Sequence, residues 1–145
     1  MSDFDVNNLL HALENNENES ILSKNLTSEK IDIIKNNVFD DIGIDDETRD
    51  DFKKKLQNYI YIDGMNDLIP GSYIRWIPLQ NPDNIHLTRG GNICDINICE
   101  KGTTVVVKNL RNNYMQICLD NCLIFRKLNN QEMILISAMN YLQNN

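Results

Sequence analysis

The chain has 145 residues, of which 41% are hydrophobic, and carries 14 Lys/Arg against 21 Asp/Glu for a net charge of −7. That length fits one domain or a small domain with an annex, and the apolar content excludes a compositionally disordered chain. The acidity argues against nonspecific DNA binding by the whole molecule. No apolar run approaches the roughly 18 residues that span a bilayer, and the start lacks a signal-peptide pattern. We therefore expect an intracellular protein that is not secreted and does not bind membranes.

The N-terminal half is predicted to be helical. Apolar spacing predicts a first helix over residues 4–15, followed by a polar stretch that breaks or frays it. A second helix is expected from an N-cap at Thr27 or Ser28, because both side chains can accept a hydrogen bond from the first turn. A third helix is expected from Asp45 or Asp46, with acidic residues early and lysines late, as the helix dipole favours.

The character of the chain changes at Pro70. Residues 1–69 hold 7 Lys/Arg against 16 Asp/Glu, whereas residues 70–145 hold 7 against 5. The sequence therefore predicts an acidic helical part joined to a mildly basic module of a different kind.

After Pro70 the chain has the pattern of short strands separated by turn residues. The predicted strands are 72–79, 84–88, 92–98, 103–109, 114–119 and 122–127. Their short loops indicate an antiparallel meander, and a sheet of this size tends to curl into a small barrel without free edges. An SH3-like or Tudor-like barrel is the first expectation and an OB-type barrel the second. A final helix follows an N-cap at Asn129 or Asn130.

These elements predict an α+β chain. The acidic helical region is assigned to residues 1–63, and the small β-barrel with the C-terminal helix to residues 64–145. Since that helix is apolar on most sides, it either closes the barrel mouth or forms a homodimer contact. The residues expected in such a contact are Ile134, Ile136 and Met139.

The segment Tyr73-Ile74-Arg75-Trp76-Ile77 is the sharpest candidate for a binding surface. Arg75 can pair with phosphate or carboxylate, and an aromatic neighbour can stack on a base or a cation. The alternative is that Trp76 fills the core and Arg75 pairs with an acidic helix, as a lone Trp in a small domain is usually buried.

A second candidate set combines basic residues with an aromatic ring. The predicted β module contains the basic residues Arg89, Lys101, Lys108, Arg111, Arg126 and Lys127, and Tyr114 follows Arg111 after two asparagines. Nucleic-acid-binding modules use this mixture of charge and stacking. The alternative is an ordinary solvated charge pattern.

Signatures of catalysis and of metal binding are missing from the sequence. The cysteine pairs Cys94/Cys99 and Cys118/Cys122 lack the knuckle spacing of zinc sites, and free buried thiols are the expectation. No P-loop, G-x-S-x-G or H-E-x-x-H motif occurs. We therefore predict a noncatalytic protein without metal or cofactor, although folding could bring His86 or a cysteine beside a carboxylate.

Residues 70–143 resemble uncharacterised proteins of large DNA viruses, in particular those that infect amoebae. The residues that carry the resemblance are Pro70-Gly71-x-Tyr73-Ile74-Arg75-Trp76-Ile77, Leu87-Thr88-Arg89-Gly90-Gly91, Val105-Val106-Val107-Lys108-Asn109 and Cys122-Leu123-Ile124-Phe125-Arg126-Lys127-Leu128. The resemblance implies a setting in the host cytoplasm, at a viral factory, or in the virion. It brings no established activity or catalytic residue.

The first functional hypothesis is a noncatalytic binding module that recognises nucleic acid or a protein partner. Its candidate ligand-binding residues are Arg75, Trp76, Lys108, Arg111, Tyr114 and Arg126. The alternative is a structural or adaptor protein that self-associates through its apolar C-terminal helix.

Overall fold

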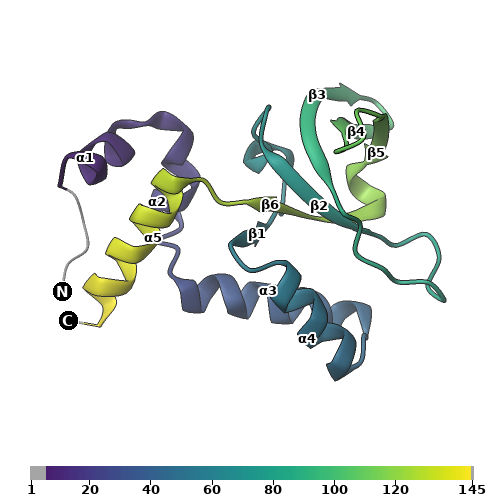
Figure 1. The fold of residues 1–145 in the computed structure, drawn as a ribbon, viewed down its shortest axis with the longest axis horizontal. Coiled ribbons are helices and arrows are strands. Elements are labelled where there is room, and N and C mark those ends of the chain that lie inside the picture. The colour runs from purple at the N-terminus through teal and green to yellow at the C-terminus, as the bar shows by residue number, and fades with distance from the viewer. Residues whose placement is uncertain (1–5, 145) are drawn as a thin grey trace. The chain divides into compact units, whose positions relative to one another are not determined.

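The computed structural model describes residues 6–144 and is of the α+β class, as predicted (Figure 1). Its α-helices are α1 (Val6–Glu14), α2 (Glu19–Ser23), α3 (Ser28–Ile42), α4 (Asp46–Lys55) and α5 (Asn130–Gln143). The strands are β1 (Tyr59–Tyr61), β2 (Tyr73–Pro78), β3 (Gly91–Cys99), β4 (Gly102–Lys108), β5 (Tyr114–Cys118) and β6 (Cys122–Lys127). Short 3₁₀ helices are η1 (Asn16–Asn18), η2 (Met65–Asp67) and η3 (Leu119–Asn121). Within residues 6–144, no helix combines the length and the apolar character needed to cross a membrane.

Backbone contacts divide the chain into two compact units. The helical unit comprises the chain up to Arg49 together with the part from Leu128 onward, and the sheet unit comprises Asp50–Lys127. The division falls inside α4 and groups α5 with the helical unit, whereas the sequence-based boundary lies between residues 63 and 64.

Side-chain caps fix where the longer helices of the helical unit begin. The Thr27 hydroxyl accepts the Lys30 N–H at 3.2 Å, so Thr27 is the N-cap of α3. Asn129 and Glu132 form a reciprocal capping box at the start of α5, with bonds of 2.8 and 3.1 Å. In both cases the first of the two residues considered from the sequence is the cap.

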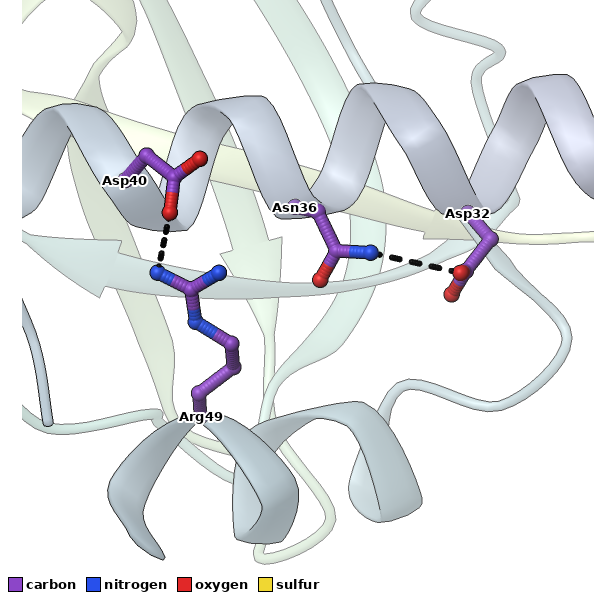
Figure 2. A network of polar contacts seen from close by, with 4 residues as sticks. All are labelled: Asp32, Asn36, Asp40 and Arg49. Carbon is purple, nitrogen blue, oxygen red and sulfur yellow. Dashed lines mark hydrogen bonds and ion pairs between the residues drawn. The ribbon is translucent and has the colours of Figure 1, made fainter. Parts of the chain in front are cut away.

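Polar contacts also connect α3 to α4. Arg49 projects from α4 and donates to Asp40 of α3, while Asn36 donates to Asp32 one turn away at 3.3 Å (Figure 2). At the start of α4, Asp45 accepts hydrogen bonds from the hydroxyl and the N–H of the residue three positions on, and these bonds hold the pKa of its carboxyl below the usual value.

The polar stretch after α1 ends that helix at Glu14, as the sequence predicts, and is itself structured. It forms η1 and α2, and Asn18 within it is fully buried. The Asn18 amide donates to the Ala12 carbonyl at 2.8 Å and to the Gln131 side chain of α5 at 3.1 Å, and Asn15 donates to Gln131 at 2.7 Å. Side-chain hydrogen bonds, and not a regular spacing of apolar residues, therefore hold this stretch in place. Gln131 lies more than a hundred positions away, so its contribution is not visible in the local sequence.

The six strands form one antiparallel sheet in the order β1-β6-β2-β3-β4-β5. The predicted meander is correct for β2 to β5, but β6 returns to lie between β1 and β2. The outermost strands β1 and β5 are not paired to each other within the described chain, so the sheet is not closed. The barrel without edges that the strand number suggested is therefore corrected to an open sheet.

Residues 84–88, predicted as a strand, have no regular secondary structure. Pro82 and the polar residues after it form a loop, and only Thr88 pairs with β2. Its N–H donates to the Trp76 carbonyl at 3.0 Å, while its hydroxyl accepts the Trp76 N–H at 3.2 Å. Because the Thr88 side chain takes the place of a backbone acceptor, the regular ladder does not continue.

One face of the sheet forms the core of the sheet unit. The buried residues on this inner face are Ile74, Trp76, Ile93, Val105, Val107, Ile117 and Ile124. On the opposite, outer face, Phe125 and Ile77 are also buried, and Arg75 reaches the Lys55 carbonyl at the end of α4. The outer face is therefore covered at β6 and β2, and it becomes exposed over β3, β4 and β5.

Candidate nucleic-acid interface

Strand register aligns four polar or aromatic residues across the outer face. The direct cross-strand pairs are Tyr73 with Asn92, Asn92 with Lys108, and Lys108 with Tyr114. Directly paired residues of antiparallel strands project from the same face, with side chains about 5 Å apart. Asn92 and Tyr114 are exposed, and Tyr73 and Lys108 are half-buried.

Lys127 continues this alignment beyond Tyr73. The ladder between β2 and β6 ends with Ile74 paired to Arg126, so Tyr73 and Lys127 are the next residues on each strand and share the outer face. Lys127 is exposed. We call the resulting set the basic–aromatic row; its members are Lys127, Tyr73, Asn92, Lys108 and Tyr114.

Tyr114 presents the most accessible ring of the row. It is the first residue of the edge strand β5 and is 66% exposed. The Lys108 Nζ lies 5.8 Å from the centroid of its ring, within the range of a cation–π interaction. The contact holds an ammonium group beside an aromatic surface that solvent still reaches.

Arg111 stands at the same end of the sheet, in the turn that joins Lys108 to Tyr114. The Asn109 side-chain oxygen accepts the N–H groups of Arg111 and Asn113, both at 2.9 Å, and the Asn109 N–H donates to the Asn113 carbonyl at 2.9 Å. Asn112 takes the left-handed conformation that asparagine tolerates well, with φ 64°. The turn is thus ordered by its own asparagines, and Arg111 is exposed on it.

Tyr73 is held in place at the other side of the row. Its hydroxyl donates to the Arg89 carbonyl at 2.5 Å. A Cβ on Gly90 would lie 3.0 Å from the Tyr73 ring and 2.1 Å from the Ile74 carbonyl oxygen, so the chain passes very close to β2 here. The exposed Arg89 therefore sits beside Tyr73 through backbone packing.

Arg75 is engaged with backbone groups. Its Nε donates to the Thr88 carbonyl at 2.8 Å and its Nη1 to the Lys55 carbonyl at 3.4 Å. Burial raises the pKa of the neighbouring Tyr59, and the positive charge of Arg75 partly offsets that rise. The side chain is half-buried and serves to connect β2 with the loop and the end of α4.

Trp76 and Arg126 lie in the interior of the sheet unit. Trp76 is 3% exposed and Arg126 is 2% exposed, and the Arg126 Nε donates to the Asp67 carbonyl at 3.2 Å. This burial favours the alternative in which Trp76 packs in the core and does not bind a ligand. Arg126 is likewise part of the interior. Of the six sequence-based candidates, the structure brings together Lys108, Arg111 and Tyr114.

Sequence reasoning missed Asn92, and it placed Tyr73 and Lys127 in two separate candidate sets. Alternation along β2 does place Tyr73 on the face opposite Trp76, which is the one local signal. The residues that lie beside Tyr73 on the neighbouring strands are known only once the strand register is known. A bulge between Ile93 and Asp95 shifts that register in β3.

Charge over the sheet unit is close to balanced. Residues 50–127 contain 10 Lys/Arg against 8 Asp/Glu. Lys127 and Lys108 belong to the row and Arg111 lies in the turn at its end, whereas the exposed Asp95 lies farther along β3, opposite Val106. The outer face is therefore mildly positive at the row.

Other reactive groups do not assemble in the part of the chain that the structure describes. Within residues 6–144, no three His, Cys, Asp or Glu side chains gather as a metal site would require. Cys94 and Cys99 are exposed, so the expectation of buried thiols is wrong for them. His86 is exposed, with its Nδ1 3.2 Å from the Asn84 carbonyl oxygen.

Chemically, the row offers two phenol rings, two ammonium groups and an amide on one accessible surface. Aromatic rings can stack on bases, ammonium groups can neutralise phosphates, and an amide can both donate and accept hydrogen bonds. The chain matches no protein-family model, no curated protein and no solved structure.

Proposed function

We propose that the protein is a noncatalytic nucleic-acid-binding module whose contact surface is the basic–aromatic row together with Arg111. The observation that supports this most is the register that pairs Lys108 with both Asn92 and Tyr114 on an exposed sheet face. The ordered turn at Arg111 adds a third cation at the same end of the sheet. No metal or cofactor has a role in this proposal.

The number of cations predicts the salt dependence of binding. Lys108, Arg111 and Lys127 could neutralise about three phosphates, which gives a slope of log K against log salt of about −2 for a single strand. A fourfold rise in salt, from about 50 to about 200 mM, should then weaken binding about 20-fold.

The test is a fluorescence-anisotropy titration of the full chain with labelled oligonucleotides at those two salt concentrations. Lys108→Ala should weaken binding and reduce the slope by about 0.7, because one phosphate contact is lost. Lys101→Ala is the matched control, since Lys101 is an exposed lysine of the same sheet in the β3–β4 turn. The proposal fails if no oligonucleotide binds at low salt, or if both variants change binding equally.

The sequence resemblance indicates where in the cell this function would be carried out. Residues 70–143, which resemble proteins of large DNA viruses, include the whole basic–aromatic row. We infer a role in the host cytoplasm or in the virion, and viral nucleic acid is the ligand to examine first.

A structural role through self-association is the second candidate. Exposed apolar side chains on α1 favour it, because Val6, Leu10 and Leu13 lie on one helical face. On α5, by contrast, Ile136 is buried within the helical unit, which leaves less of the expected dimer surface. Leu10→Glu should give a folded monomer in light scattering if α1 mediates association; a wild-type chain that is already monomeric would exclude this role.

A further inference from the structure

We propose that the basic–aromatic row binds single-stranded nucleic acid in preference to duplex, and that an unpaired base stacks on Tyr114 beside Lys108. This inference rests on the proposed function, because it names the ligand class of the same surface. It goes further by assigning the aromatic ring, and not only the cations, to recognition.

The environment of Tyr114 is suited to stacking. Tyr114 is 66% exposed, and it lies on β5, the last strand of the sheet within the described residues. The Lys108 ammonium lies over the ring, 5.8 Å from its centroid, and most of the residue remains exposed. An unpaired base could therefore cover the ring while its phosphate meets Lys108 or Arg111. In a duplex the same base faces are already stacked on their neighbours, so they could not reach Tyr114.

A second ring lies along the row at a distance suited to a short single strand. Tyr73 is three strands from Tyr114, which is about 14 Å at the usual spacing of strands. Asn92 and Lys108 lie between the two rings and offer an amide and an ammonium group. Sheet surfaces with aromatic residues typically stack two or three bases. The distance of about 14 Å between Tyr73 and Tyr114 fits a strand segment of that length.

The shortage of positive charge also favours a single strand. Duplex recognition without base stacking depends on many phosphate contacts, and the row with Arg111 supplies about three cations. Base stacking is sequence-tolerant and contributes about 5- to 150-fold in affinity per base. A surface with few cations and accessible rings is therefore better matched to unpaired bases than to a duplex backbone.

The test compares single-stranded DNA and RNA of about 12 nucleotides with the matching DNA duplex, by anisotropy with the full chain. Each single strand should bind at least about fivefold more tightly than the duplex. Tyr114→Leu should weaken single-strand binding about fivefold or more, whereas Tyr114→Phe should retain it because the ring remains. Tyr141→Leu is the control, since Tyr141 is half-exposed on α5 of the helical unit.

Each outcome separates this inference from the proposed function. Duplex binding equal to or tighter than single-strand binding would overturn the inference but leave nucleic-acid binding in place. Equal affinities for Tyr114→Leu and Tyr114→Phe would overturn the assigned stacking. Absence of binding to any oligonucleotide at low salt would overturn both. The comparison of single-stranded with duplex oligonucleotides uses the unmodified protein, so it stays decisive even if a variant is poorly folded.

Discussion

Three glycine-to-alanine variants can measure how closely the loop before β3 packs on β2. Gly90 and Gly71 share a φ of +86°, but a Cβ at Gly71 would meet nothing within 4 Å, whereas a Cβ at Gly90 would lie 2.1 Å from the Ile74 carbonyl oxygen. Gly64 has neither a positive φ nor a close neighbour. The series therefore separates the cost of backbone conformation from the cost of steric overlap.

The expected magnitudes follow from these differences. Gly64→Ala should be neutral or stabilising by up to about 1 kcal/mol, because alanine restricts the unfolded chain. Gly71→Ala should cost about 1 kcal/mol, since the positive φ is unfavourable by about 1–2 kcal/mol and the unfolded-state effect offsets part of it. Gly90→Ala carries the same conformational cost plus about 1–3 kcal/mol for overlap with backbone that cannot rotate away, and should total about 2–4 kcal/mol.

The assay is urea unfolding followed by the fluorescence of Trp76, the single tryptophan of the chain, which is buried in the sheet unit. The midpoint of Gly90→Ala should fall by about 1–3 M relative to wild type if the slope is unchanged. Equal free energies of unfolding for Gly90→Ala and Gly71→Ala would refute the close approach to β2. That result would also remove the packing that holds Tyr73 in the basic–aromatic row.

Two further predictions concern helix capping and thiol reactivity. Asn129→Ala removes the N-cap of α5 and should lower the free energy of unfolding of the helical unit by about 1 kcal/mol in urea unfolding followed by far-UV circular dichroism, whereas Asn129→Ser should recover most of the loss. Burial, and to a smaller extent the nearby Cys118, raises the pKa of the Cys122 thiol, so this group stays protonated to a higher pH than an ordinary thiol. Iodoacetamide near pH 8 should therefore alkylate the exposed Cys94 well before Cys122, whose labelling should rise only at higher pH; mass spectrometry that finds equal rates would contradict this assignment.

Features with a local physical cause were predicted well from the sequence. The strands β2, β3, β4, β5 and β6 begin and end within one residue of their predicted positions, because turn residues separate short alternating segments. The caps at Thr27 and Asn129 follow from side chains that bond only three residues ahead. Each signal is contained in one short window of sequence.

The strand order depends on interactions that no short window contains. A simple meander would have left β6 at an edge, with Arg126 free to contact a ligand. In the structure β6 lies between β1 and β2, so Arg126 is paired on both sides, with Ile60 and Ile74, and is buried. The same non-local pairing sets Lys127 beside Tyr73, which is why three members of the row were not found together from sequence.

The division of charge between the two units determines which forces an interface on the sheet can use. The helical unit carries 4 Lys/Arg against 13 Asp/Glu, and the sheet unit 10 against 8. In the proposed complex, lower salt would strengthen the contacts of Lys108 and Arg111 with phosphates, because the screening length rises from about 10 Å at 0.1 M to about 30 Å at 0.01 M. The net charge of −7 works against long-range steering of a polyanion, so the proposed binding depends on short-range contacts. In the proposed complex, stacking on Tyr114 and hydrogen bonding by Asn92 supply these short-range contacts, and stacking on Tyr114 requires a base that is unpaired.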